Sequence, residues 1–198
     1  IPAMQAKYPG LEFEAGGEQE ERNTAYGSLG VGLLISLFGI YGLLAIPLKS
    51  YLQPLVVMSV VPFGAIGAIT GHYALSVDLM FFSALGIVAL TGVVVNASLV
   101  LVDYSNRRRR AGESIEEAIT ASAIVRFRPI ILTSVTTFVG LIPLMTTTTP
   151  STAPFLPMAV SLAWGVLFST FITLLLVPCL YLMAEDFTTG LSKVLKPL

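Results

Sequence analysis

Two apolar stretches of this 198-residue chain carry polar side chains that could handle protons or ions. Asn96 is the only amide within residues 79–102, and Gly92 precedes it by one helical turn on the same face. A second stripe has helical spacings of 4, 3, 4 and 3 residues and consists of Arg126, Ile130, Thr133, Thr137 and Gly140. An amide in hydrocarbon gains about 0.6–2 kcal/mol from a partner on another helix. The pattern therefore predicts that Asn96 and this stripe face a shared polar interior.

A plainer interpretation of the threonines is equally open. A threonine hydroxyl can donate a hydrogen bond to a carbonyl of its own helix, and it then needs no partner elsewhere.

Carboxylates are missing from the middle of every apolar stretch. The charged residues nearest to them lie at their ends: Asp78, Asp103, Arg126 and Arg128. Charged groups at such ends reach the membrane interface easily. If the protein moves protons or ions, we expect the titrating carboxylates to come from outside this sequence.

The elements that must position these residues are membrane helices. The chain is 55% hydrophobic and 12% charged, whereas soluble domains carry about 25% charged residues. A helix needs roughly 20 apolar residues to cross a bilayer. Five stretches meet that length, at about 26–48, 54–74, 79–104, 127–146 and 154–184. The sequence predicts an all-α polytopic membrane protein with five transmembrane helices.

The basic residues predict how these helices are oriented. Nine of the eleven Lys and Arg residues fall on one side, including Arg107–Arg110, and the remaining two precede the first span. Because basic loops stay in the cytoplasm, we expect the N-terminus on the opposite side of the membrane and a cytoplasmic C-terminal tail at 187–198. Residues 1–25 are expected to be the end of an extramembrane domain, since Leu11–Glu14 alternates like a strand and the stretch is too short to bury a core.

A short helix is predicted over 114–124, between spans three and four. Ser114 followed by Glu117 forms a capping box, and Ile115, Ala118 and Ile119 fall on one side. This helix could lie along the cytoplasmic membrane surface, and a soluble connector is the alternative.

Small residues indicate where helices approach closely. The sequence predicts packing contacts at Gly67, Gly71, Gly92, Ser161, Gly165 and Ser169. No nucleophile set, metal-spaced cluster or phosphate-binding loop occurs, so we expect no enzymatic activity, no metal and no cofactor. The arginine cluster is explained by membrane topology and contact with lipid headgroups, so no nucleic-acid partner is expected.

Three motifs resemble the C-terminal membrane half of the resistance-nodulation-division (RND) efflux transporters. They are PFGAIGA at 62–68, GVVVNASLVLVD at 92–103 and RFRPIILTS at 126–134, in the family's order and spacing. The resemblance implies the last five transmembrane helices of a proton-driven exporter in the bacterial inner membrane, with a periplasmic N-terminus and with residues 1–25 as the end of a periplasmic α/β porter domain. It also implies an N-terminal half as partner, a homotrimer, a periplasmic adaptor and an outer-membrane channel.

The same resemblance implies a role for particular residues. Arg126 and Thr133 match the family's coupling residues on its eleventh helix, and Asn96 stands where the family has a lysine. The paired aspartates of the family lie outside this chain.

Three functions are therefore open. The chain is expected to be a fragment of an exporter of hydrophobic or amphiphilic compounds. The alternatives are a relative that exports lipids or assists protein translocation, and a membrane scaffold that does not transport.

Overall fold

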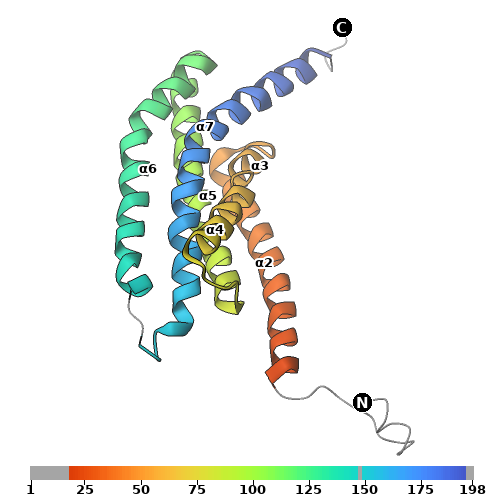
Figure 1. Cartoon of the computed structure of the whole chain (residues 1–198). Helices are drawn as coiled ribbons and strands as arrows, with labels where there is room; N and C mark the ends of the chain where they lie inside the picture. The colour runs from red at the N-terminus through yellow and green to blue at the C-terminus, as the bar shows by residue number, and fades with distance from the viewer. Residues whose placement is uncertain (1–17, 147–148, 195–198) are drawn as a thin grey trace, which may run out of the picture. The chain divides into compact units, whose positions relative to one another are not determined.

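The computed structural model describes residues 18–146 and 149–194, with side chains over 23–146 and 149–185. Its regular elements are α2 (Glu18–Leu48), α3 (Gln53–Met58), α4 (Val61–Leu75), α5 (Phe81–Arg110), α6 (Ile115–Thr146), η1 (Ala153–Phe155) and α7 (Leu156–Val194) (Figure 1). The all-α prediction is confirmed for these residues. The predicted strand at 11–14 lies outside them.

Five stretches are long and apolar enough to cross a membrane: Asn23–Leu48, Gln53–Leu75, Phe81–Arg110, Ile115–Thr146 and Ala153–Glu185. The prediction of five spans is confirmed by these lengths and compositions. Several ends differ from prediction, since α2 begins at Glu18, within the segment assigned to a porter domain, and α7 continues to Val194. The orientation of the chain in the membrane stays a prediction.

The chain divides into two units, Ile1–Ser36 and Leu37–Leu198, and α2 runs through the boundary between them. In the first unit, residues 23–36 of α2 bury no side chain. In the second unit, Leu44 and Leu48 at the end of α2 are buried in the main hydrophobic cluster. The second unit contains the residues that concern function.

The second predicted span is interrupted. The span predicted over 54–74 is present as Gln53–Leu75, but it consists of two helices, since α3 ends at Met58 and α4 begins at Val61. Pro62 has no N–H to donate to the carbonyl four residues earlier, which favours an end to the preceding helix. The Ser59 hydroxyl donates to the Val56 carbonyl oxygen at 2.6 Å and satisfies one acceptor at this end.

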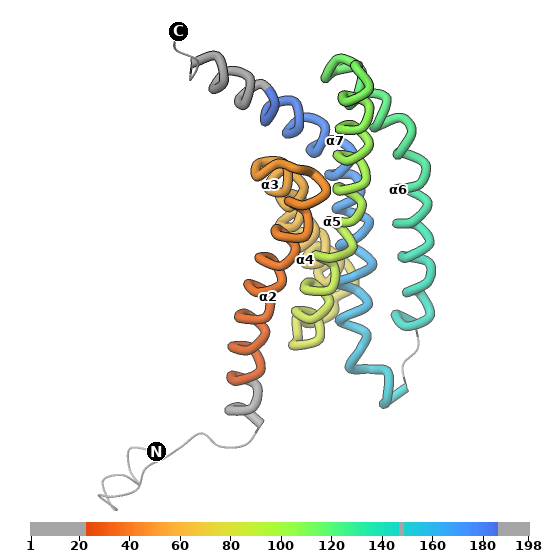
Figure 2. The backbone as a smooth tube through the Cα atoms, turned by 180° about the vertical axis from the view of Figure 1, so that it is seen from behind, coloured from red at the N-terminus to blue at the C-terminus, as the bar shows by residue number. Residues whose placement is uncertain are grey.

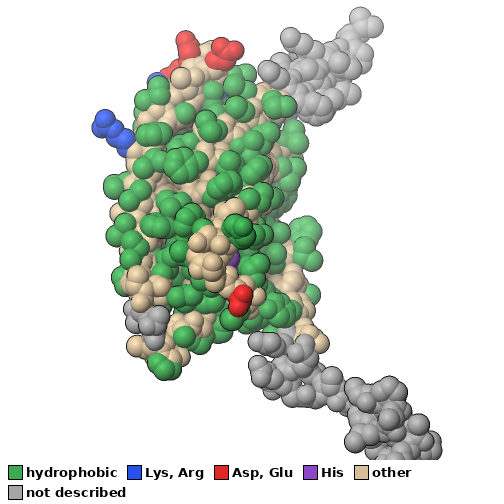
Figure 3. Space-filling view, viewed as in Figure 1, with side chains coloured by type: hydrophobic (Ala, Val, Ile, Leu, Met, Phe, Trp, Pro, Cys, Tyr) green, Lys and Arg blue, Asp and Glu red, His purple; other side chains and the backbone are tan. Residues whose placement is uncertain are grey.

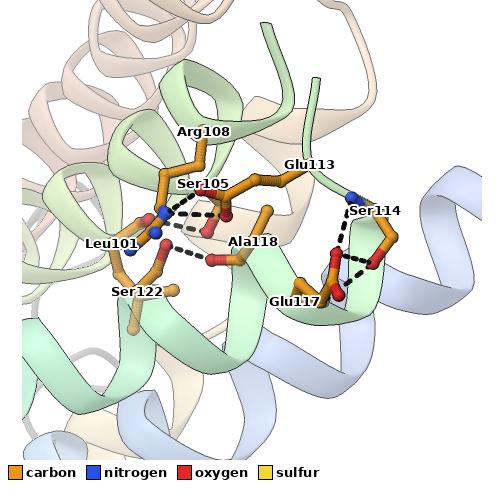
Figure 4. A network of polar contacts seen from close by, with 8 residues as sticks. All are labelled: Leu101, Ser105, Arg108, Glu113, Ser114, Glu117, Ala118 and Ser122. Atoms are coloured by element: carbon orange, nitrogen blue, oxygen red, sulfur yellow. Dashed lines mark hydrogen bonds and ion pairs between the residues drawn. The ribbon is translucent and has the colours of Figure 1, made fainter. Parts of the chain in front are cut away.

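A tight turn joins α5 to α6. Gly112 has φ +100°, a backbone conformation that glycine adopts without strain. The Arg108 Nε donates to both Glu113 carboxylate oxygens, at 2.8 and 2.7 Å. Ser114 and Glu117 form the predicted capping box, with the Glu117 N–H donating to the Ser114 hydroxyl at 3.3 Å (Figure 4). These contacts fix where α6 starts.

Helix α6 is one continuous helix from Ile115 to Thr146. The prediction of a separate helix over 114–124, followed by a span from 127, is therefore wrong. Pro129 lies inside α6, where it removes one backbone hydrogen bond without ending the helix, and α6 changes direction along its length (Figure 1).

Helix α7 lies beside α4, α5 and α6 (Figures 1 and 2). The face seen in Figure 3 is largely hydrophobic, with its few charged side chains near the ends of the bundle. Exposed apolar side chains on α6 include Leu132, Val135 and Val139, as expected for a chain that lies in lipid or packs against further helices.

Candidate functional site: a polar cavity between three helices

A cavity of about 160 Å³ lies among α5, α6 and α7. Its walls are apolar in part, and its polar lining residues are Asn96, Arg126, Thr133, Ser134, Ser169, Thr170 and Thr173. Three of the four residues predicted for a shared polar interior, Asn96, Arg126 and Thr133, are brought together here. Thr137 does not line the cavity.

The Asn96 amide forms no hydrogen bond with the part of the chain that the structure describes, and its side chain is exposed. Gly92, one turn earlier, is also exposed, and a Cβ added to it would meet no atom within 4 Å. The packing contact predicted at Gly92 is therefore absent within the described residues. The reason is geometric, since Gly92 shares the open face of α5 with Asn96.

The Arg126 side chain brings a positive charge to the cavity wall. Its Nε atom is buried and has no hydrogen-bond partner among the described residues. Its guanidinium carbon lies 5.0 Å from the centroid of the Tyr104 ring. No carboxylate lines the cavity within the described chain. The site could therefore receive an anionic or strongly polar partner.

The threonine hydroxyls of α6 donate back to their own helix. The Thr133 hydroxyl donates to the Pro129 carbonyl at 2.8 Å, and the Thr137 hydroxyl donates to the Thr133 carbonyl at 2.8 Å. The plainer interpretation thus describes the bonding of both residues. Thr133 also fits the interpretation that these residues face a shared polar interior, because it lines the cavity.

A hydroxyl pair that the sequence did not suggest crosses from α6 to α7. Ser134 and Thr170 are both buried, line the cavity and share a hydrogen bond. Each hydroxyl also lies near a carbonyl of its own helix, Ile130 for Ser134 and Val166 for Thr170. The only sequence signal was the position of each residue beside a polar site candidate.

Small residues let α4 and α5 approach α7 closely. A Cβ at Gly67 would lie 2.4 Å from the Cβ of Phe168, and one at Gly71 would lie 2.3 Å from the Trp164 ring. A Cβ at Gly165 would lie 2.2 Å from Leu90 of α5. The Ser161 hydroxyl donates to the Ser83 carbonyl at 3.0 Å, and buried Ser169 bonds within α7.

A second polar cluster joins one end of α3, α5 and α7, and sequence reasoning missed it. Gln53 and Asn106 exchange two amide hydrogen bonds of 3.1 and 2.6 Å, and the Tyr181 hydroxyl donates to the Asn106 oxygen at 2.8 Å. Glu185 accepts from Gln53 at 3.1 Å and pairs with Arg109 at 2.6 Å. The residues are far apart in sequence, so no spacing could reveal them.

His72 is buried between α4 and α5. Its Nδ1 lies 2.9 Å from the Ala68 carbonyl and its Nε2 lies 2.9 Å from the Ser83 hydroxyl. A carbonyl can only accept, so Nδ1 carries the hydrogen and the Ser83 hydroxyl donates to Nε2. The imidazole is thus a satisfied buried group.

Comparison with known proteins shows which family shares this sequence. The profile of the AcrB/AcrD/AcrF family matches residues 3–185. The multidrug resistance protein MdtC of Proteus mirabilis is 29% identical over 154 residues, which cover 77% of this chain and 15% of MdtC. The cobalt-zinc-cadmium resistance protein CzcA of Cupriavidus metallidurans is 29% identical over 182 residues, which cover 91% of this chain and 17% of CzcA.

A solved structure is similar in fold as well as sequence. The crystal structure of a heavy metal efflux pump superposes with a TM-score of 0.77 at 27% identity, over 93% of this chain and 19% of the pump. The chain therefore spans less than a fifth of the length of these relatives. The family match covers most of the chain and agrees with the three motifs and the five apolar helices, so the chain belongs to the AcrB/AcrD/AcrF family of RND efflux transporters.

Proposed function

We propose that this chain is the C-terminal membrane portion of a proton-driven exporter. The observation that supports this most strongly is the cavity lined by Asn96, Arg126 and Thr133. It presents a cation, an amide and hydroxyls, and within the described residues it has no acid of its own. A carboxylate from another part of the whole protein would complete it.

A carboxylate in that position would be sensitive to pH in a useful way. Beside Arg126 it would favour its charged form, and a proton that neutralised it would remove the attraction between the two groups. Such a change in charge pairing can shift helices between two arrangements. Because Asn96 replaces a lysine, we propose that Arg126 is the principal cation of this site.

The whole transporter is proposed to act in the bacterial inner membrane with partners. The N-terminal half would supply the missing helices against the open faces of α5 and α6. A homotrimer with a periplasmic adaptor and an outer-membrane channel follows from the family, as does contact with membrane lipid. A scaffold that does not transport is the alternative of another class.

Two substrate classes have a specific observation behind them. MdtC is named for multidrug resistance, which supports hydrophobic or amphiphilic compounds. CzcA is named for cobalt, zinc and cadmium resistance, which supports metal cations. No group of three His, Cys, Asp or Glu residues that could hold a metal lies within the described part of this chain. A metal substrate would therefore meet its ligands in other parts of the whole protein.

The test uses the full-length gene in a bacterial host that lacks its own efflux pumps. Cells are loaded with ethidium or with Zn²⁺, and retention is followed with and without a protonophore. We expect lower retention of one probe, and we expect the protonophore to abolish that effect. The Arg126→Ala variant should retain the probe as empty cells do, whereas Arg128→Ala, at an exposed position, should export it.

Two outcomes would contradict the proposal. Export that survives the protonophore would remove the proton coupling, and full export by Arg126→Ala would remove the cavity from the mechanism. Equal retention of a wide panel of dyes and metals with and without the gene would favour the scaffold.

A further inference from the structure

The ring of Tyr104 on α5 lies close to two guanidinium groups. Its ring centroid is 5.0 Å from the guanidinium carbon of Arg126 on α6 and 5.9 Å from that of Arg108 on α5. Both distances are within the roughly 6 Å over which an aromatic face attracts a cation. The same ring therefore attracts two guanidinium groups, whose like charges repel each other.

The two cations differ in their other partners. Arg108 is paired with Glu113 at 2.7 Å, and this carboxylate offsets its charge (Figure 4). Arg126 has no ion pair with the described residues, and its buried Nε has no hydrogen-bond partner there. The aromatic face of Tyr104 is thus the principal described contact of the Arg126 charge.

The turn between α5 and α6 holds the second of these arginines, Arg108. Glu113 lies in the turn itself and holds Arg108 through two contacts of 2.8 and 2.7 Å. The guanidinium carbon of Arg108 in turn lies 5.9 Å from the centroid of the Tyr104 ring. The ring, the paired arginine and the turn form one unit next to the cavity.

From this geometry we infer that Tyr104 is a positioning residue that holds the Arg126 guanidinium at the cavity. Its effect on export rests on the proposed function, but its effect on Arg126 does not. A charged side chain with several rotatable bonds is productive only when it is held in one place, because reorienting it at each cycle slows the step that depends on it. The ring supplies that restraint without neutralising the charge.

The first experiment compares two variants of the full-length transporter. Tyr104→Phe keeps the ring and should export ethidium or Zn²⁺ within twofold of the natural protein. Tyr104→Leu removes the aromatic face and should lower export about 5- to 30-fold, the rate equivalent of a cation–aromatic contact of about 1–2 kcal/mol. Tyr73→Leu is the matched control, since Tyr73 is 90% exposed on α4.

The second experiment reads Arg126 itself and needs no transport. Purified full-length protein is treated with phenylglyoxal, and the modification rate of each arginine is followed by mass spectrometry. We expect Tyr104→Leu to raise the rate at Arg126 by roughly threefold or more, whereas Tyr104→Phe leaves it unchanged. Exposed Arg128 is the internal control, and membrane abundance and oligomer elution check that each variant folds.

The inference is overturned if Tyr104→Leu leaves the Arg126 modification rate unchanged, or if Tyr104→Phe behaves like Tyr104→Leu in both experiments. If the natural protein exports neither probe while the labelling result holds, the proposed function fails and the positioning role stands.

Discussion

The two sides of α7 hold their neighbours by different means. Towards α4 and α5, glycines let the helices approach until no Cβ could be added at Gly67 or Gly71. Towards α6, the side chains of Ser169, Thr170 and Thr173 line an open cavity. Of the most apolar window of each span, 44% is buried in α5 and 11% in α6. One side is closely packed, and the other retains a cavity that Asn96 and Arg126 line.

This difference suggests a division of labour. Tight contacts between small residues resist relative movement, because packed interiors have few low-energy alternatives. A polar cavity beside a loosely covered helix can change its contents and its charge pairing. We therefore expect substitutions on the glycine side to affect stability first and those on the cavity side to affect export first.

The largest expected effect is on the glycine side. Gly67→Leu would place a side chain where Phe168 and the Trp164 backbone already lie, and we expect it to destabilise the full-length protein by about 3 kcal/mol or more. Thermal unfolding in detergent measures this. Gly140→Leu is the matched control, since a Cβ there meets nothing within 4 Å. Equal melting temperatures for the two variants would refute the tight interface.

Asn106→Leu tests the polar cluster at the end of the tight side. It would leave the Gln53 amide and the Tyr181 hydroxyl without their shared partner, and both residues are buried. An unsatisfied buried polar group is destabilising by about 1–3 kcal/mol. The melting temperature should fall, and Tyr41→Phe, which removes an exposed hydrogen bond to the Tyr51 carbonyl, should change it little. An unchanged melting temperature for Asn106→Leu would show that this cluster does not stabilise the contact among α3, α5 and α7.

Ala97→Leu tests the opposite behaviour on the cavity side. Ala97 lines the cavity, so a larger apolar side chain would occupy that space without disturbing the glycine contacts. We expect export to fall about tenfold, equivalent to about 1.4 kcal/mol in the barrier, with a melting temperature close to that of the natural protein. Retention of ethidium or Zn²⁺ by cells measures export. A lower melting temperature with unchanged export in Ala97→Leu would contradict the expectation that cavity-side substitutions affect export first.

The smallest expected effect separates two similar threonines. Thr133→Val and Thr137→Val each remove one hydroxyl that donates within α6, but only Thr133 lines the cavity. We expect Thr133→Val to lower export about threefold and Thr137→Val to change it less than twofold, consistent with one hydrogen bond of about 0.6 kcal/mol. Initial rates of probe loss from preloaded cells would resolve the two. Identical rates for the two variants would contradict the prediction that lining the cavity gives Thr133 a larger role in export than Thr137.

Much of the architecture follows from the sequence, because the length and composition of an apolar stretch are local properties. The meeting of Asn96, Arg126 and Thr133 also follows, since helical spacing fixes the face on which a residue lies; their role in coupling stays a prediction. The division of Gln53–Leu75 and the continuity of α6 were missed because a proline can stand just after a helix break, as Pro62 does at the start of α4, or inside a continuous helix, as Pro129 does in α6. Neighbouring helices decide between these outcomes.

Contacts that depend on tertiary placement were beyond reach. Gln53, Asn106 and Tyr181 come from three elements separated by at least 53 residues, and each is unremarkable in its own stretch. Gly92 was predicted to pack closely, as Gly67 and Gly71 do, yet it faces the open side of α5. The sequence identifies small residues, but the partner helix determines which of them are used.

The continuity of α6 has a mechanical consequence. Arg126 lies eleven residues from the first residue of this helix, or about 16 Å along a rigid rod. A rotation at the Ser114–Glu117 cap would therefore swing the arginine through an arc instead of being absorbed by a flexible joint. Because α6 connects the turn after Arg110 to the cavity, we expect a displacement of the turn to move Arg126, and a displacement of Arg126 to move the turn.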